Sequence, residues 1–292
     1  MGAASLSAVH APLRGALWMV AAGACFAIGN SLLRHLTTGS LHPYQVAFLQ
    51  YGIALLLLLP WVLLRGGASY RTRRPFLQAI RVVAAAIGVL FLTLAFRELP
   101  VAEVVALTFT APLFATLGAA PFLGERVGWR RWAATGVGFL GVLVILRPGL
   151  ETFRLEALLP LAAALFFAAS SLIVKRLSAT ETADSIVLYL LVLMTPILLV
   201  PALPVWQAPT AAHALPLAAL GLSAAAAQLA LVRAFAAADA SFLGPFDFAR
   251  LPFSALVAFV AFGEAPDRVL WIGAAFIVTA ALYLAHEESR PG

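Results

Sequence analysis

Two stretches of the chain read PLFATLGAAPFLGE at residues 112–125 and PFSALVAFVAFGE at residues 252–264. Each stretch begins with a proline, continues through small and apolar side chains, and ends with a Gly-Glu pair. The two Gly-Glu pairs lie 139 positions apart, which is close to half of the 292-residue chain. The apolar character is typical of helices that cross a membrane, and the recurrence indicates that the chain is built from two related halves.

The composition of the whole chain also indicates an integral membrane protein. Hydrophobic residues make up 63% of the sequence and charged residues 11%, and the mean hydropathy is +0.98. A soluble domain has roughly 45–50% apolar and about 25% charged residues, so a soluble globule and a disordered chain are both excluded. The net charge of +6 indicates positive cytoplasmic loops rather than a nucleic-acid partner, because no Lys/Arg run is backed by a polar or aromatic binding face.

Ten apolar stretches are long enough to cross the ~30 Å hydrocarbon core as helices. They are too long and too uniformly apolar for barrel strands, and the first is longer than the apolar core of a signal peptide. The short connections leave no room for a soluble catalytic or nucleotide-binding domain. The ten stretches are residues 14–36, 43–64, 75–97, 100–123, 129–147, 154–176, 183–204, 213–236, 241–262 and 267–286.

The distribution of Lys and Arg predicts the orientation of these helices. With a cytoplasmic N-terminus, twelve Lys and Arg residues fall on the cytoplasmic side and five on the other side. The positive-inside rule therefore predicts that both termini are cytoplasmic. We expect an all-α, multi-pass protein of the inner membrane, held in the lipid bilayer as a monomer or homodimer.

More residue pairs support the repeat. Ala95-Phe96 recurs as Ala234-Phe235, and Trp132 recurs as Trp271, again 139 positions apart. Each half holds five predicted helices, and an odd number turns the second half upside down in the membrane relative to the first. We therefore predict two inverted five-helix repeats, residues 1–148 and 149–292, around a central cavity, as in many secondary transporters.

These motifs resemble the drug/metabolite transporter superfamily, in its ten-helix EamA-type branch. The resemblance rests on the two stretches that run from Pro112 to Gly124-Glu125 and from Pro252 to Gly263-Glu264, and on GERVGWRRW at residues 124–132. It implies a basket formed by the first, third, fourth, sixth, eighth and ninth helices, with the fifth and tenth as peripheral scaffold. It also implies that Glu125 and Glu264 make structural or gating contacts.

Prolines interrupt the predicted helices at matching places in the two halves. A proline has no N–H to donate to the carbonyl four residues earlier, so Pro112 and Pro252 each weaken their helix. Gly244-Pro245 loosens the ninth helix a second time. Interruptions paired between halves indicate a hinge or gate beside a central site, although a kink used only for packing is the alternative.

Asp247 and Arg250 are the most informative polar pair. Their spacing places them on one face of a helix, and Arg250 lies ~13 Å below the start of its span, near the bilayer midplane. A charge at that depth costs about 2.5–3.5 kcal/mol, so neither side chain is expected to face lipid. Two arrangements are open. In the first, the two side chains form an ion pair inside the bundle. In the second, they face the cavity, where Arg250 binds a substrate carboxylate and Asp247 orients Arg250, binds a substrate ammonium group or carries a coupling proton.

Other polar and aromatic residues fall in spans that line the expected cavity. Arg81 either reaches the cytoplasmic surface or supplies a second contact to an anion. The hydroxyl groups either bond to their own helix or face substrate, whereas the two amides are harder to satisfy locally. An aromatic side chain either stacks on substrate or packs. The remaining candidate substrate-binding residues are Asn30, Thr108, Thr110, Ser171, Gln228 and Phe246.

Several other signals are rejected. The glycines of GVGFLG at residues 136–141 lie inside an apolar span, so they indicate close helix packing, here against residues 267–286, rather than a dinucleotide site. The histidines do not pair at metal-ligand spacing, and no P-loop motif is present. We expect no metal, no cofactor and no enzymatic activity.

The leading hypothesis is therefore a transporter that exports small organic metabolites, most consistent with amino acids, by alternating access. The resemblance supplies the direction and the substrate class. The main alternative is an uptake carrier for a vitamin, a nucleoside-like metabolite or S-adenosylmethionine. A membrane scaffold or an intramembrane enzyme is a remote alternative, because ionisable residues at midplane are functional by default.

Overall fold

The computed structural model describes residues 3–39, 41–64, 72–123, 129–146, 154–177, 180–237 and 246–288. All the regular structure in these ranges is helical. The α-helices are α1 (Ala3–Thr38), α2 (Pro43–Leu64), α3 (Pro75–Glu98), α4 (Val101–Thr108), α5 (Ala111–Leu123), α6 (Trp129–Leu146), α7 (Leu158–Leu177), α8 (Ala183–Ala202), α9 (Ala211–Ala237), α11 (Arg250–Phe262) and α12 (Arg268–Glu288). Short 3₁₀ helices at Leu155–Ala157 and Leu203–Val205 precede α7 and follow α8.

The helices have the length and composition of a multi-pass membrane protein. Seven segments of the described chain are long and apolar enough to cross a bilayer, and three further apolar helices are shorter. The shorter ones lie at residues 132–146, 250–262 and 268–280. The all-α membrane fold is thus confirmed, whereas ten spans, two inverted repeats and cytoplasmic termini remain predictions.

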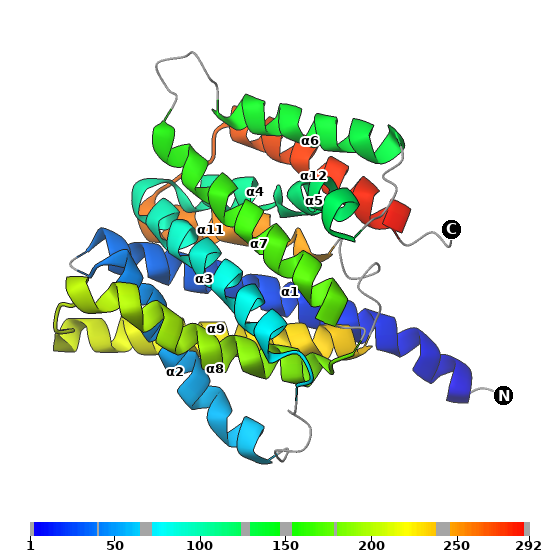
Figure 1. The fold of residues 1–292 in the computed structure, drawn as a ribbon. Helices are drawn as coiled ribbons and strands as arrows, with labels where there is room; N and C mark the ends of the chain where they lie inside the picture. The colour runs from blue at the N-terminus through cyan, green and yellow to red at the C-terminus, as the bar shows by residue number, and fades with distance from the viewer. Residues whose placement is uncertain are drawn as a thin grey trace.

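Helix α1 organises the bundle, since it packs against α2, α3, α4, α9 and α11. In Figure 1, α6 and α12 lie together on one flank, while α1, α2, α8 and α9 lie on the other. Helices α4, α5 and α11 run between these two groups. The start of α1 and the end of α12 lie at the same end of the molecule (Figure 1), which we call the terminal end.

The fourth predicted span is divided in two, just before its proline. Helix α4 ends at Thr108, and α5 begins at Ala111. At the interruption, the N–H groups of Phe109 and Thr110 donate to carbonyls only three residues earlier. Pro112 has no N–H for the carbonyl of Thr108, so the regular α-helical pattern fails here.

The same interruption occurs before the second proline. Ala249 and Leu251 donate to the carbonyls of Phe246 and Phe248, again three residues earlier, and α11 begins at Arg250. Pro252 would have been the α-helical donor to Phe248. Both proline rings are exposed, so they act through the missing N–H rather than through side-chain packing.

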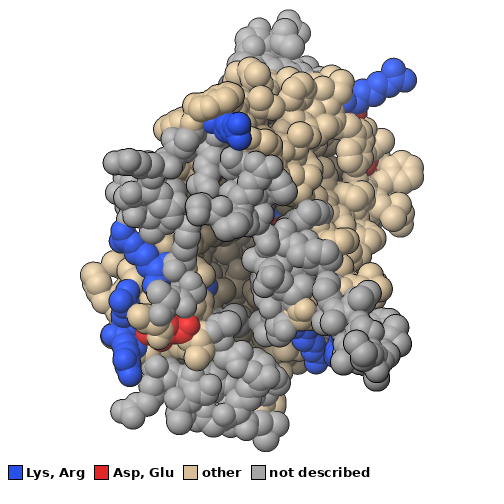
Figure 2. Space-filling model, turned by 90° about the vertical axis from the view of Figure 1, so that its right-hand side faces the viewer, with Lys and Arg blue, Asp and Glu red and all other residues tan. Residues whose placement is uncertain are grey.

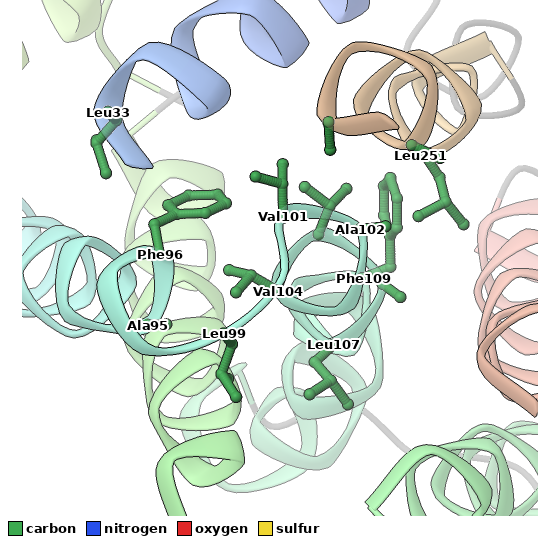
Figure 3. Packing of buried hydrophobic residues seen from close by; sticks show 14 of the residues in the cluster. Leu33, Ala95, Phe96, Leu99, Val101, Ala102, Val104, Leu107, Phe109 and Leu251 are labelled. Atoms are coloured by element: carbon green, nitrogen blue, oxygen red, sulfur yellow. The ribbon is translucent and has the colours of Figure 1, made fainter. Parts of the chain in front are cut away.

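Helix α4 occupies the centre of the apolar core. Figure 3 shows Val101, Val104 and Leu107 of α4 among side chains from α1, α3 and α11. These three side chains have no exposed surface. The short helix before the interruption is thus enclosed by protein, which is where an interrupted helix is tolerated in a membrane.

Helices α6 and α12 are held together by glycines. A Cβ atom on Gly141 would lie 2.6 Å from the carbonyl oxygen of Gly273, and one on Gly273 would lie 2.8 Å from the carbonyl oxygen of Gly141. Small residues allow two membrane helices to approach this closely. The structure thus confirms a role in helix packing for Gly138 and Gly141, whereas nothing lies within 4 Å of the Cβ position of Gly136.

The substitution Gly141→Ala is expected to destabilise this helix pair. The new methyl group would overlap the backbone of α12, and overpacking of this kind costs about 1–3 kcal/mol. We therefore expect a lower melting temperature for the purified protein in detergent. Gly136→Ala on the same helix is the control, because nothing lies within 4 Å of its Cβ position. An equal melting temperature for both variants would contradict the close α6–α12 contact.

Candidate functional site

The two helix interruptions meet in the interior of the protein. Phe109, at the α4–α5 interruption, and Phe248, just before α11, have ring centroids 4.7 Å apart at an interplanar angle of 47°. Figure 3 shows the ring of Phe109 directed towards Leu251 of α11. Residues that lie about half a chain apart in the sequence therefore form one aromatic contact.

The guanidinium group of Arg250 lies beside this contact. Arg250 is the first residue of α11, and its Cζ lies 4.9 Å from the ring centroid of Phe109. The ring of Phe26, on α1, lies 5.5 Å from the same atom. An Arg side chain over aromatic faces is stabilised by the ring quadrupoles, more so where water is excluded. The cation is therefore held between α1 and the two interruptions.

Helix α1 approaches this site closely because it carries a glycine there. A Cβ atom on Gly23 would lie 3.4 Å from the backbone nitrogen of Arg250. A larger side chain at position 23 would press on the backbone at the start of α11. Gly23 and Phe26 lie three residues apart on one face of α1, and together they set the position of Arg250.

Arg250 retains unused hydrogen-bonding capacity. Its Nε atom is buried and has no hydrogen-bond partner among the described residues. Nη2 lies 4.0 Å from Oδ2 of Asp247, beyond the roughly 2.7–2.9 Å of a charge-assisted hydrogen bond. A buried donor without an acceptor is costly, so the site favours a ligand that brings an acceptor oxygen or nitrogen.

A second polar cluster lies at the opposite end of α1 and α11. A guanidinium nitrogen of Arg34 lies 2.5 Å from a carboxylate oxygen of Glu264, and the other donates to the carbonyls of Phe96 and Leu99 at the end of α3. The second carboxylate oxygen of Glu264 accepts a hydrogen bond from the N–H of Val101 at 3.2 Å. We call these five residues the Arg34 latch, since they join α1, α3, α4 and α11.

The backbone at Gly263 brings Glu264 into the latch. Gly263 has φ 70°, in the left-handed region that favours glycine, and its N–H donates to the carbonyl of Phe259. This conformation ends α11 and turns the chain back towards α1. The Gly-Glu pair of the second half therefore combines a helix-ending residue with a carboxylate for Arg34.

Another contact joins helices at this end of the molecule. The amide side chain of Gln45, on α2, donates to the carbonyl of Gln207 at 2.6 Å and accepts from its N–H at 3.0 Å. Gln45 has no exposed surface.

An open cavity of about 370 Å³ lies beside the latch, with Glu103, Arg154 and Asp267 in its lining.

The terminal end has a different surface. Figure 2 views the molecule from that end and shows Lys and Arg side chains at several places on the face. The Arg34 latch and the Gln45–Gln207 pair both lie away from this face, near the α1–α2 and α8–α9 connections. The latch and the glutamine pair thus tie the chain together at the end of the bundle opposite the termini.

The structure brings some of the predicted site residues together. Asp247 and Arg250 lie beside the aromatic contact, next to the interruption that contains Thr108 and Thr110. The hydroxyls of these threonines donate to the carbonyls of Val105 and Leu107 on α4, each three residues earlier in the chain. Of the two alternatives that the sequence leaves open, a bond to the nearby backbone or a contact with substrate, the structure therefore shows the first. Asn30 and Gln228 are half-buried on α1 and α9, which pack along each other.

Three other predicted residues occupy different surroundings. Arg81 is buried, and its Nη1 donates to the carbonyl of Ile186 on α8 at 2.8 Å, so it does not reach the surface. Phe246 packs against a small cluster that contains Met19 and Ala234. Ser171 is exposed on α7. Of the candidate hinge and signature residues, Gly124, Glu125, Gly244 and Pro245 lie outside the described residues.

Two functional candidates were missed by sequence reasoning. Phe26 is not among the candidates from the sequence, because an aromatic residue in an apolar span carries no distinctive signal. Arg34 enters the sequence analysis only as one of the five Lys and Arg residues on the non-cytoplasmic side. One signal could have identified Arg34 as a partner of Glu264. Both residues lie near the end of an apolar span at the same end of the bundle, and charges in such places pair with each other inside membrane proteins.

The helical bundle and its interrupted central helices define a multi-pass membrane protein. The chain matches the EamA-like transporter family over residues 13–147. It is 42% identical over 289 residues to a Vibrio cholerae serotype O1 protein named riboflavin transporter, covering 98% of this chain and 97% of that protein. A Rickettsia prowazekii protein named S-adenosylmethionine uptake transporter is 30% identical over 278 residues, covering 95% and 94% of the two chains.

A solved crystal structure shows the same fold. One of its chains aligns with a TM-score of 0.63 at 22% identity, covering 97% of this chain and 99% of that one. The chain therefore belongs to the EamA-like transporter family, within the drug/metabolite transporter superfamily. It is a multi-pass protein of the inner membrane that transports small metabolites.

The Arg34–Glu264 pair is expected to contribute far more to stability than an exposed pair. Its side chains are 16% and 21% exposed, and both make further hydrogen bonds. A double-mutant cycle with Arg34→Gln and Glu264→Gln should give a coupling energy of about 1–3 kcal/mol in the free energy of unfolding.

The neighbouring pair Arg97–Glu98 provides a matched control. Its side chains are 46% and 48% exposed with an N–O distance of 3.6 Å, so its coupling should be about 0.5 kcal/mol or less. A coupling energy for Arg34–Glu264 no larger than this value would contradict the latch.

Proposed function

We propose that the chain is an uptake carrier for riboflavin, or for a vitamin with the same fused-ring chemistry, across the inner membrane. The observation that carries this proposal is the 42% identity to a protein named riboflavin transporter over 98% of the chain. The geometry at Arg250 supports it independently, because the site combines aromatic rings with an unpaired buried donor.

The chemistry of riboflavin suits such a site. Its isoalloxazine ring is planar and aromatic, and a ring of this kind gains from offset stacking on Phe side chains and on an Arg plane. Its ring carbonyls and nitrogens accept hydrogen bonds, which Arg250 Nε lacks among the described residues. The amides of Asn30 and Gln228 are candidates for the ribityl hydroxyls, since each amide both donates and accepts.

Alternating access fits a set of contacts that closes one end of the bundle. The Arg34 latch ties four helices together at the end opposite the termini. We propose that the latch closes the outer side while substrate exchanges with the cytoplasm. The interruptions before Pro112 and Pro252 are the flexible points about which the two halves move, and opening the outer side requires Arg34 and Glu264 to separate.

The comparisons favour uptake of a heteroaromatic metabolite over the export of amino acids. Both named relatives reported above carry names for molecules that contain a fused aromatic ring system. A zwitterion anchor at Arg250 would need a strong carboxylate contact, whereas the surroundings of this side chain are mainly aromatic.

S-adenosylmethionine is the second candidate substrate. One observation favours it besides the named relative: the Asp247 carboxylate lies 4.0 Å from the guanidinium of Arg250, which lies over the rings of Phe26 and Phe109, and the Asp247 side chain is 39% exposed. A carboxylate beside aromatic faces attracts a cation such as a sulfonium or ammonium group. A competition experiment with both compounds separates the two candidates.

The substitution Arg250→Ala is expected to reduce riboflavin uptake at least tenfold. Loss of the guanidinium removes the buried donor and one stacking partner, and a charged hydrogen bond contributes roughly 1.5–3 kcal/mol. The measurement is the growth of a riboflavin-auxotrophic bacterium on limiting external riboflavin, together with initial uptake rates. Arg250→Lys should restore only part of the rate, because an ammonium group lacks the planar fork.

Arg233→Gln is the matched control for this experiment. Arg233 also lies over an aromatic ring, 4.8 Å from the centroid of Trp18, but it is exposed on α9. Its loss should leave uptake within about twofold, as expected for an exposed contact. Unchanged uptake by Arg250→Ala, at equal amounts of protein in the membrane, would contradict the proposed site.

A further inference from the structure

A groove on the flank of the bundle lies apart from the transport site. It runs between α6 and α12 and has a volume of about 330 Å³. Alanines form its floor, among them Ala133, Ala134 and Ala280, while Trp129 and Tyr283 stand at its sides. Because small residues lie between large ones, the groove is built into the helix pair.

The surroundings of the groove are apolar and exposed. On α6, Val137, Leu140 and Leu143 are 39–55% exposed, and on α12, Ile272 and Phe276 are 52% and 41% exposed. In a membrane protein, such a face is turned towards the acyl chains of the bilayer. The groove is therefore filled by lipid or by another protein, not by water.

One end of the groove has the chemistry of a membrane interface. Trp129 is the first residue of α6 and is 76% exposed, and Tyr283 lies near the end of α12. Aromatic residues of this kind mark the level of the lipid headgroups. Arg130 lies beside them, with its Cζ 5.9 Å from the ring of Trp129. A positive charge thus stands where the groove meets the headgroups.

The positive-inside rule places this end on the cytoplasmic side. Helices α6 and α12 have these residues at the terminal end, and Arg126, Arg130 and Arg131 lie close together in the sequence. Clusters of Arg attract the anionic headgroups of the cytoplasmic leaflet, and basic pockets between membrane helices on this side bind such headgroups. The charge of the groove is complementary to an anionic lipid and not to a zwitterionic one.

We propose that the α6–α12 groove binds one anionic phospholipid, with an acyl chain along the alanine floor and the phosphate headgroup at Arg130. The volume lies within the range of sites that hold small molecules. The close contact between Gly141 and Gly273 fixes the two helices, so the groove exists before lipid arrives. The bound lipid anchors the scaffold helices while the central helices move.

Native mass spectrometry of the purified full-length protein tests this proposal. The protein is titrated with phosphatidylglycerol or with phosphatidylcholine of the same acyl chains. We expect tighter binding of phosphatidylglycerol, and Arg130→Gln should weaken that binding about fivefold, as one juxtamembrane Arg contributes to anionic lipid binding. Ala133→Phe, which fills the exposed part of the groove, should weaken the binding of both lipids.

Arg176→Gln is the control, because Arg176 is exposed at the end of α7 and does not line the groove. It should leave the preference for phosphatidylglycerol unchanged. Equal binding of the two lipids, or equal losses in Arg130→Gln and Arg176→Gln, would overturn the proposal. A lipid-free dimer that Ala133→Phe dissociates would also overturn it, since a second copy would then cover the groove. The melting temperature of each variant verifies its fold.

Discussion

The structure depends on one constraint: backbone groups inside a bilayer have no water to satisfy them. A helix interrupted by proline is therefore tolerated only where protein surrounds it or where it lines a cavity. Pro112 and Pro252 create two such interruptions, and the fold places them against each other, with Phe109 and Phe248 4.7 Å apart. The meeting point of these two interruptions is thus a place where polar chemistry is possible, and Arg250 lies there.

The rest of the bundle can be understood from this centre outwards. Helix α1 reaches it through Gly23 and Phe26, and at its other end it carries Arg34 to the carboxylate of Glu264. Helix α11 likewise begins at Arg250 and ends at Phe262, just before Gly263 and Glu264. One pair of helices therefore connects the central site with the closure at the end opposite the termini. A movement that separates α1 from α11 would change both places together, which is what a carrier requires.

The sequence predicted the membrane class, the helical stretches and the paired interruptions, because apolar length and missing proline donors are local properties. It also made Asp247 and Arg250 candidate site residues, since charges in an apolar span are conspicuous, and their role in transport stays a prediction. It did not identify Phe26 or Arg34 as partners, because their roles depend on which helices become neighbours. Thr108 and Thr110 stood on the candidate list for their polarity, yet their hydroxyls bond within α4 and its interruption. Arg81 donates a hydrogen bond to a carbonyl of α8, and sequence spacing does not predict this contact between distant helices.

The most direct test of the account is riboflavin binding at the meeting point of the two interruptions. Riboflavin fluorescence is measured during titration with the purified protein, with Phe109→Leu, and with Phe114→Leu as control. Phe114 forms an aromatic pair with Phe139, 5.4 Å apart, away from Arg250. The account predicts saturable quenching by the wild-type protein and by Phe114→Leu, and at least tenfold weaker binding by Phe109→Leu, since one stacked ring contributes roughly 1–3 kcal/mol. No saturable quenching, or equal affinities for all three proteins, would contradict it.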